Sequence, residues 1–87
     1  MNFTITHNSD TQRFEAHIDG HVPYVEYSLD DNTFDIIHTI VPQPLEGQGI
    51  ASKLVSYAYQ YAKDKGYNLK GSCSYAHIWL QRHPMYG

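Results

Sequence analysis

Hydrophobic residues alternate with polar ones near the start of the chain, which is the pattern of β-strands that bury one face. The alternating positions of the first two expected strands are Phe3 and Ile5, then Phe14, Ala16 and Ile18. Asp19-Gly20 predicts a two-residue hairpin turn, because glycine adopts the positive φ that such turns require. A third strand is expected over residues 22–29. Pro23 then lies at a sheet edge or early in the strand, since proline cannot donate to the ladder.

A fourth strand is expected over residues 33–41, where hydrophobic residues fall on both faces. Phe34, Ile36 and Ile40 would share one face, and Ile37 and Val41 the other. A strand that is buried on both faces is usually central in its sheet. We therefore expect this strand to have a neighbour on each side.

From Ile50 onward the hydrophobic residues recur every three or four positions, which is the period of an amphipathic helix. Gly66 predicts the end of that helix, because glycine is favoured just after a helix C-terminus. A short strand over residues 67–72 and a second helix at Ser74–Arg82 follow, the helix with Ala76, Trp79 and Leu80 facing inward. The sequence thus predicts one α+β domain over residues 1–87: an antiparallel four-stranded meander, a helix, a short fifth strand and a C-terminal helix.

Composition and charge narrow the functional classes. The formal net charge is −3 and there is no basic stripe of the kind that nucleic-acid binding needs. No segment approaches the ~20 apolar residues of a membrane helix, and the N-terminal residues lack the features of a signal peptide. The six histidines show no metal-ligand spacing, so we expect no metal site. Cys73 is the single cysteine, which fits a cytoplasmic setting.

Residues 45–51, Leu-Glu-Gly-Gln-Gly-Ile-Ala, join the fourth strand to the first helix. Gly47 and Gly49 let the backbone approach a ligand closely and point successive N–H groups the same way. The helix start adds unpartnered N–H groups and a partial positive charge, which together favour a phosphate. The loop is neither a P-loop, which needs Gly-Lys-Ser/Thr, nor a Rossmann fingerprint, because Ser52 stands at the third glycine position. Two glycines before a helix also fit a simple turn.

Short motifs follow one another between residues 38 and 86. They are His38-Thr39-Ile40-Val41-Pro42, then Leu45-Glu46-Gly47-Gln48-Gly49-Ile50-Ala51, Cys73-Ser74-Tyr75 and His83-Pro84-Met85-Tyr86. In this order they resemble the small stand-alone proteins of the GCN5-related N-acetyltransferase (GNAT)-like family. The loop is also similar to the acetyl-CoA pyrophosphate loop of the wider superfamily, Gln/Arg-x-x-Gly-x-Gly/Ala, except that Pro44 holds the Gln/Arg position.

The resemblance implies a GNAT-like fold that uses acetyl-CoA as a cosubstrate. The strand that ends near Val41 would separate from its neighbour and pair with the pantetheine arm, while the loop N–H groups would hold the pyrophosphate. His83 would either close the last helix or reach the cofactor phosphates. The residues expected at the cofactor are Ile40, Val41, Pro42, Leu45, Glu46, Gly47, Gln48, Gly49, Ile50, Ala51, Ser52, Tyr75 and His83.

Cys73 and His38 are the candidate catalytic residues. Cys73 directly precedes the second helix, where the helix dipole lowers the pKa of a thiol. The resemblance favours it as an acetyl acceptor or a pocket-lining residue, and the alternative is a buried structural cysteine. His38 is either a general base near neutral pH or a sheet histidine with a satisfied hydrogen bond. Larger relatives carry a tyrosine near the position of Trp79 and Leu80 that acts as the general acid and protonates the leaving thiolate. Tyr75 could replace that tyrosine only if its side chain faces the pocket.

The leading hypothesis is therefore an N-acetyltransferase that moves an acetyl group from acetyl-CoA to an unidentified amine acceptor. A module that binds CoA or acyl-CoA with little or no turnover is the alternative. The intact glycines at 47 and 49 argue against a third class, an interaction domain without a cofactor. We expect a cytoplasmic monomer or weak homodimer that binds neither nucleic acid nor membranes.

Overall fold

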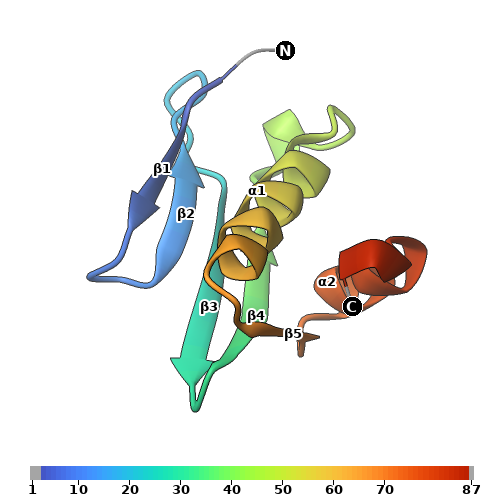
Figure 1. Cartoon of the computed structure of the whole chain (residues 1–87). Coiled ribbons are helices and arrows are strands. Elements are labelled where there is room, and N and C mark those ends of the chain that lie inside the picture. The colour runs from blue at the N-terminus through green and yellow to red at the C-terminus, as the bar shows by residue number, and fades with distance from the viewer. Residues whose placement is uncertain (1–2, 87) are drawn as a thin grey trace.

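Five strands form one mixed sheet in the computed structural model, which describes residues 3–86 (Figure 1). The strands are β1 (Ile5–Asn8), β2 (Arg13–Ala16), β3 (Tyr24–Asp30), β4 (Thr33–Ile40) and β5 (Asn68–Gly71). They lie in the sheet in their sequence order. The first four pair antiparallel, and β5 pairs parallel to β4. The predicted fold class, with its meander and short fifth strand, is confirmed.

Two helices follow the meander. α1 (Ile50–Asp64) lies across one face of the sheet and connects β4 to the parallel strand β5, while α2 (Ser74–Arg82) lies beside the β5 edge (Figure 1). Short 3-10 helices at Gln43–Leu45 and Pro84–Tyr86 precede α1 and follow α2. α2 has the predicted bounds, and α1 ends where predicted, since Gly66 follows its C-cap with a φ of 79°.

The hydrophobic core lies between α1 and the sheet face that α1 covers. Its largest fully buried side chains are Tyr59, Phe14, Phe34, Ile36, Ile50, Leu54, Val25 and Val55. Tyr27 stacks on Phe34 with ring centroids 4.5 Å apart. In α2, Ala76 and Trp79 are buried as predicted, whereas Leu80 is only half-buried.

The turn between β2 and β3 differs from the prediction in one detail. Ile18 is buried but lies outside β2, because it forms only an isolated bridge with His21. Both residues of the Asp19-Gly20 turn have positive φ, 50° and 78°, so the predicted hairpin is confirmed. Pro23 is buried just before β3 begins, which agrees with an early position and not with an edge strand.

β4 contains a bulge that the alternation of its residues does not reveal. The register pairs Glu26 of β3 with His38 but Tyr27 with Ile36. Ile37 therefore has no partner in β3. An extra residue of this kind reverses which alternate positions of a strand face the core.

The two faces of β4 are exchanged beyond the bulge. Phe34 is fully buried before it, whereas Ile40 after it is 44% exposed, so the expectation that these residues share a buried face is wrong. Thr39 and Val41 are instead half-buried, and His38 is exposed. β4 is central, as predicted, but only its first half is buried on both faces.

Two features fix the corner between β5 and α2. The carboxylate of Asp35, buried in β4, accepts hydrogen bonds from the backbone N–H of Ser72 at 2.8 Å and from its hydroxyl at 2.6 Å. Gly71 has no room for a side chain, since a Cβ there would lie 2.7 Å from the backbone nitrogen of His77. The start of α2 is thus held directly against the end of β5.

Candidate functional site

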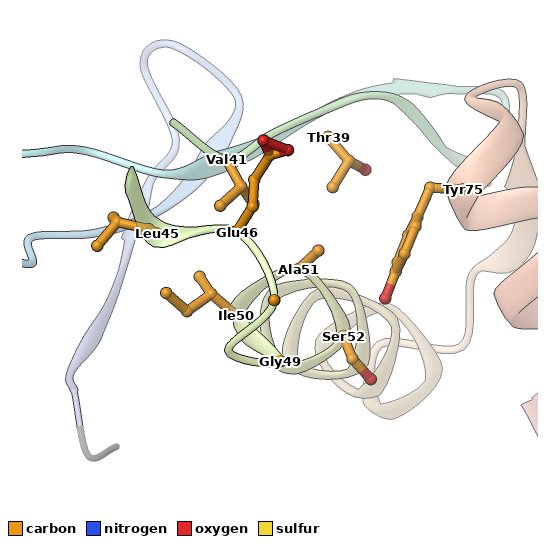
Figure 2. Close-up of a pocket in the computed structure, with 10 residues that line it drawn as sticks. Thr39, Val41, Leu45, Glu46, Gly49, Ile50, Ala51, Ser52 and Tyr75 are labelled. Carbon is orange, nitrogen blue, oxygen red and sulfur yellow. The ribbon is translucent and has the colours of Figure 1, made fainter. Parts of the chain in front are cut away.

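A cavity of about 440 Å³ lies where the end of β4, the loop before α1, and the starts of α1 and α2 meet (Figure 2). Its lining residues are Thr39, Val41, Leu45, Glu46, Gly47, Gly49, Ile50, Ala51, Ser52 and Tyr75. All of these except Thr39 were predicted from the sequence. The cavity therefore brings together three motifs that are separate in the sequence.

The loop before α1 has the backbone geometry that the two glycines predict. Gly47 and Gly49 have φ values of 81° and 76°, in the left-handed region that other residues rarely adopt. A Cβ at either position would meet no atom within 4 Å, so conformation and not crowding requires glycine here. Gly49 is the N-cap of α1 and supplies no side-chain cap, and the first turn carries no acidic residue. The first N–H groups of α1 are therefore left available for an anion.

The outer edge of β4 is paired over only part of its length. β5 pairs with residues 33–36 of β4, and its last pair joins Ile36 to Gly71. The carbonyl of Ile36 then accepts a hydrogen bond from the N–H of Cys73 at 3.0 Å. In the described part of the chain, no strand pairs with residues 37–40 on this edge. An extended ligand that carries amide groups can bind such an edge as an added strand.

The bulge places Thr39 in the cavity, beside the cysteine. The hydroxyl oxygen of Thr39 lies 3.5 Å from the sulfur of Cys73. Burial acts to raise the pKa of the Cys73 thiol, but its hydrogen bonds with the Thr39 hydroxyl and with nearby backbone groups outweigh that effect, so the pKa lies below its ordinary value. Cys73 is half-buried and does not itself line the cavity. It contacts the cavity through Thr39.

Tyr75 projects from the start of α2 toward the start of α1. Figure 2 shows its hydroxyl end directed toward Ser52, so that the side chain forms one wall of the cavity. The side chain is 40% exposed. The side chain of Tyr75 therefore faces this cavity, which is the orientation that the sequence analysis required of it.

Some predicted site residues lie outside this lining. His38 and Ile40 are exposed on the sheet face that the bulge turns away from α1. Pro42 and Gln48 belong to the loop but do not line the cavity. These residues lie next to lining residues in the chain, and their roles at a ligand stay predictions.

His83 lies at the C-cap of α2, where its backbone N–H bonds to the carbonyl of Leu80. Its ring stacks on Trp79 with centroids 3.8 Å apart, and its Nδ1 lies 2.7 Å from the Trp79 carbonyl oxygen. A carbonyl can only accept, so Nδ1 carries the proton. His83 closes the helix and also borders a second cavity beside the first.

Two other classes of site can be checked within residues 3–86. No three side chains of His, Cys, Asp or Glu gather there in a way that could hold a metal ion. None of the helices in that range is both long and apolar enough to cross a membrane.

Comparisons with known proteins place this geometry in context. A family model described as GCN5-related N-acetyl-transferase matches residues 13–87. An NMR structure of a GCN5-like protein from Staphylococcus aureus, assigned provisionally as an N-acetyltransferase, matches with a TM-score of 0.76 and 27% sequence identity. That similarity covers 95% of this chain and 82% of the other. The family match includes every residue that lines the cavity.

Proposed function

Because the chain belongs to the GCN5-related N-acetyltransferases, we propose that it transfers an acetyl group from acetyl-CoA to the amine of an acceptor. The observation that carries the proposal is one cavity that joins a helix start with free N–H groups to a strand edge that no strand covers in the described residues. Acetyl-CoA combines the two matching groups, because its pantetheine arm carries amides and its pyrophosphate is an anion.

The residues of the cavity suit these groups in different ways. The edge of β4 at residues 37–40 offers backbone groups to the pantetheine amides. The N–H groups of the loop and of the first turn of α1 suit the pyrophosphate without a lysine. The half-buried side chain of Val41 supplies an apolar wall.

In the proposed reaction the amine nitrogen attacks the thioester carbonyl and the carbon–sulfur bond breaks. The electron pair of that bond leaves with the CoA sulfur, which then takes up a proton. The attacking amine releases a proton in the same reaction, so the proton that the CoA sulfur takes up is balanced. In a two-step variant, the Cys73 thiolate first takes the acetyl group and then passes it to the amine. The lowered pKa of Cys73 supports this variant.

A binding module with little or no turnover is the second candidate. It is favoured by one observation: neither of the residues expected to do chemistry, His38 and Cys73, lines the cavity. This candidate shares the cofactor site with the first, so binding and turnover need separate tests.

Binding is tested by thermal unfolding with and without acetyl-CoA. A 100-fold excess over the dissociation constant should stabilise the protein by about 2.7 kcal/mol. Gly47→Val should remove this stabilisation, since valine is strained at a φ of 81°. Gly20→Val is the matched control, because Gly20 has a φ of 78° in a hairpin away from the cavity. The absence of any stabilisation of the wild-type chain at millimolar acetyl-CoA would refute both candidates.

Turnover is tested with labelled acetyl-CoA and a panel of amine acceptors. Label in an amine product supports the acetyltransferase, whereas binding without any labelled product favours the binding module. Intact-mass measurement of the protein after mixing shows whether Cys73 carries an acetyl group. A Cys73→Ala protein that transfers label at the normal rate would exclude the two-step variant.

A further inference from the structure

A second cavity, of about 350 Å³, lies directly beside the first, between the start of α1 and the outer part of α2. Its lining residues are Ser52, Tyr75, Ile78, Trp79, Arg82 and His83. Ser52 and Tyr75 line both cavities. The two cavities are thus adjacent compartments that meet where Tyr75 reaches toward Ser52 (Figure 2).

The side chains of this second cavity offer hydrogen-bond donors and no carboxylate. The guanidinium of Arg82 has no hydrogen bond or ion pair within the described residues. Trp79 is 5% exposed, and its indole Nε1 is buried without an acceptor among those same residues. An unpaired buried donor is costly, so an acceptor supplied by a ligand would stabilise this arrangement.

Two other cations of the chain, Arg13 and Lys63, are engaged elsewhere. Arg13 pairs with Glu26 at 3.1 Å and lies over the ring of Tyr24. Lys63 donates to the carbonyl of Met85 at 3.1 Å. Arg82 is therefore a free guanidinium at the rim of a cavity, and a guanidinium binds a phosphate through two parallel hydrogen bonds.

We propose that the second cavity holds the adenosine end of CoA and that Arg82 recognises the 3′-phosphate of its ribose. This inference rests on the proposed function, which puts the pyrophosphate at the start of α1. The adenosine is attached to that pyrophosphate, and the second cavity shares Ser52 and Tyr75 with the cavity of the pyrophosphate site. Arg82 is thereby a specificity residue that distinguishes CoA from 3′-dephospho-CoA.

The experiment compares CoA with 3′-dephospho-CoA, two ligands that differ only in that phosphate. Trp79 is the only tryptophan of the chain and lines the second cavity, so its fluorescence reports on occupancy there without any need for turnover. Wild-type protein should bind dephospho-CoA about five- to tenfold more weakly than CoA, the range for one arginine–phosphate contact at a partly exposed site. The Trp79 emission should change with both ligands.

Variants separate the phosphate contact from general electrostatics. Arg82→Gln should weaken the binding of CoA to the level of dephospho-CoA and leave dephospho-CoA unaffected. Lys70→Gln, which removes one exposed positive charge from β5 outside both cavities, should keep the difference between the ligands. Circular dichroism checks that each variant is folded.

Two results would overturn the inference while leaving the proposed function intact. One is equal affinity of the wild-type protein for the two ligands. The other is an Arg82→Gln variant that still distinguishes them. If neither ligand binds the wild-type protein at all, the proposed function itself fails and this inference fails with it.

Discussion

The two halves of β4 belong to one strand but have different surroundings. Residues 33–36 pair with β3 on one edge and with β5 on the other, and Phe34, Asp35 and Ile36 are buried. Beyond Ile36, residues 38–40 pair with β3 alone within the described chain, and residues 37–40 alternate between half-buried and exposed. The first half belongs to the core, and the second half forms a wall of the candidate site.

The bulge at Ile37 separates these two roles. Before it, the strand is stabilised by hydrogen bonds on both edges and by aromatic packing against α1. After it, one edge is open and Thr39 is turned toward the cavity. Substitutions in the first half should therefore affect folding, and substitutions in the second half should affect binding or chemistry with little effect on folding.

The largest expected effect on stability comes from Phe34. Its side chain is fully buried, stacks on Tyr27 and meets the ring of Tyr59 edge-on. Phe34→Ala should lower the free energy of unfolding by about 3–5 kcal/mol, measured by urea denaturation. Ile40→Ala is the matched change in the second half, where the side chain is 44% exposed, and it should cost less than about 1 kcal/mol. Equal losses in the two variants would contradict the division of the strand.

The next largest effect is expected at Gly71, where the pairing of β5 with β4 ends. Gly71→Ala would bring a Cβ to 2.7 Å from the backbone of α2, so the helix must move away from β5. We expect a loss of about 1–3 kcal/mol in the free energy of unfolding. Lys70→Ala, at the neighbouring exposed position, should be close to neutral. A Gly71→Ala protein of unchanged stability would show that the close packing of α2 on β5 is not needed.

Thr39→Val should leave the free energy of unfolding nearly unchanged but alter the cysteine. It removes the hydroxyl that lies 3.5 Å from the Cys73 sulfur, so the pKa of the thiol should rise. The pH profile of alkylation by iodoacetamide should then shift to higher pH. Thr33→Val, in the first half of the strand, should leave that profile in place. An unshifted profile for Thr39→Val would show that the Thr39 hydroxyl does not lower the pKa of the Cys73 thiol.

The smallest expected effect is a pH dependence of the free energy of unfolding that arises from His7. His7 stacks on Phe14 with centroids 4.2 Å apart, its Nε2 lies 2.6 Å from the Tyr27 hydroxyl, and burial lowers its pKa from 6.5. As pH falls below that ordinary value, the unfolded chain binds a proton that the folded chain resists. The free energy of unfolding should therefore fall between pH 7 and pH 5.

Urea denaturation of His7→Gln tests this pH dependence, because the fall should become smaller in that variant. His17→Gln, which changes an exposed histidine, should keep the full dependence. Since His7 lies on the core side, the affinity for acetyl-CoA should not follow the same pH profile. If the full fall in the free energy of unfolding remains in His7→Gln, the pH dependence arises from another group.

Much of the fold could be predicted because its elements carry local signals. The Asp19-Gly20 turn, the α1 stop at Gly66 and the bounds of α2 each depend on residues close in sequence. The conformation of the loop glycines that line the cavity could be predicted for the same reason, since a positive φ is a local requirement.

The register of β4 could not be predicted in this way. A bulge arises from the pairing of two strands, and the alternation of residues within one strand contains no sign of it. Ile40 was therefore assigned to the core face with Phe34, and Thr39 was missed as a lining residue. The second cavity likewise depends on how α2 packs beside α1, which no local pattern specifies.

An amide NMR titration with acetyl-CoA tests the central claim most directly, because it reads both halves of β4 in one experiment. The account predicts that signals from residues 37–41 and 47–52 shift as ligand is added, while signals from residues 33–36 remain nearly unchanged. Shifts concentrated in residues 33–36, or no shifts in either loop or strand at millimolar acetyl-CoA, would contradict it.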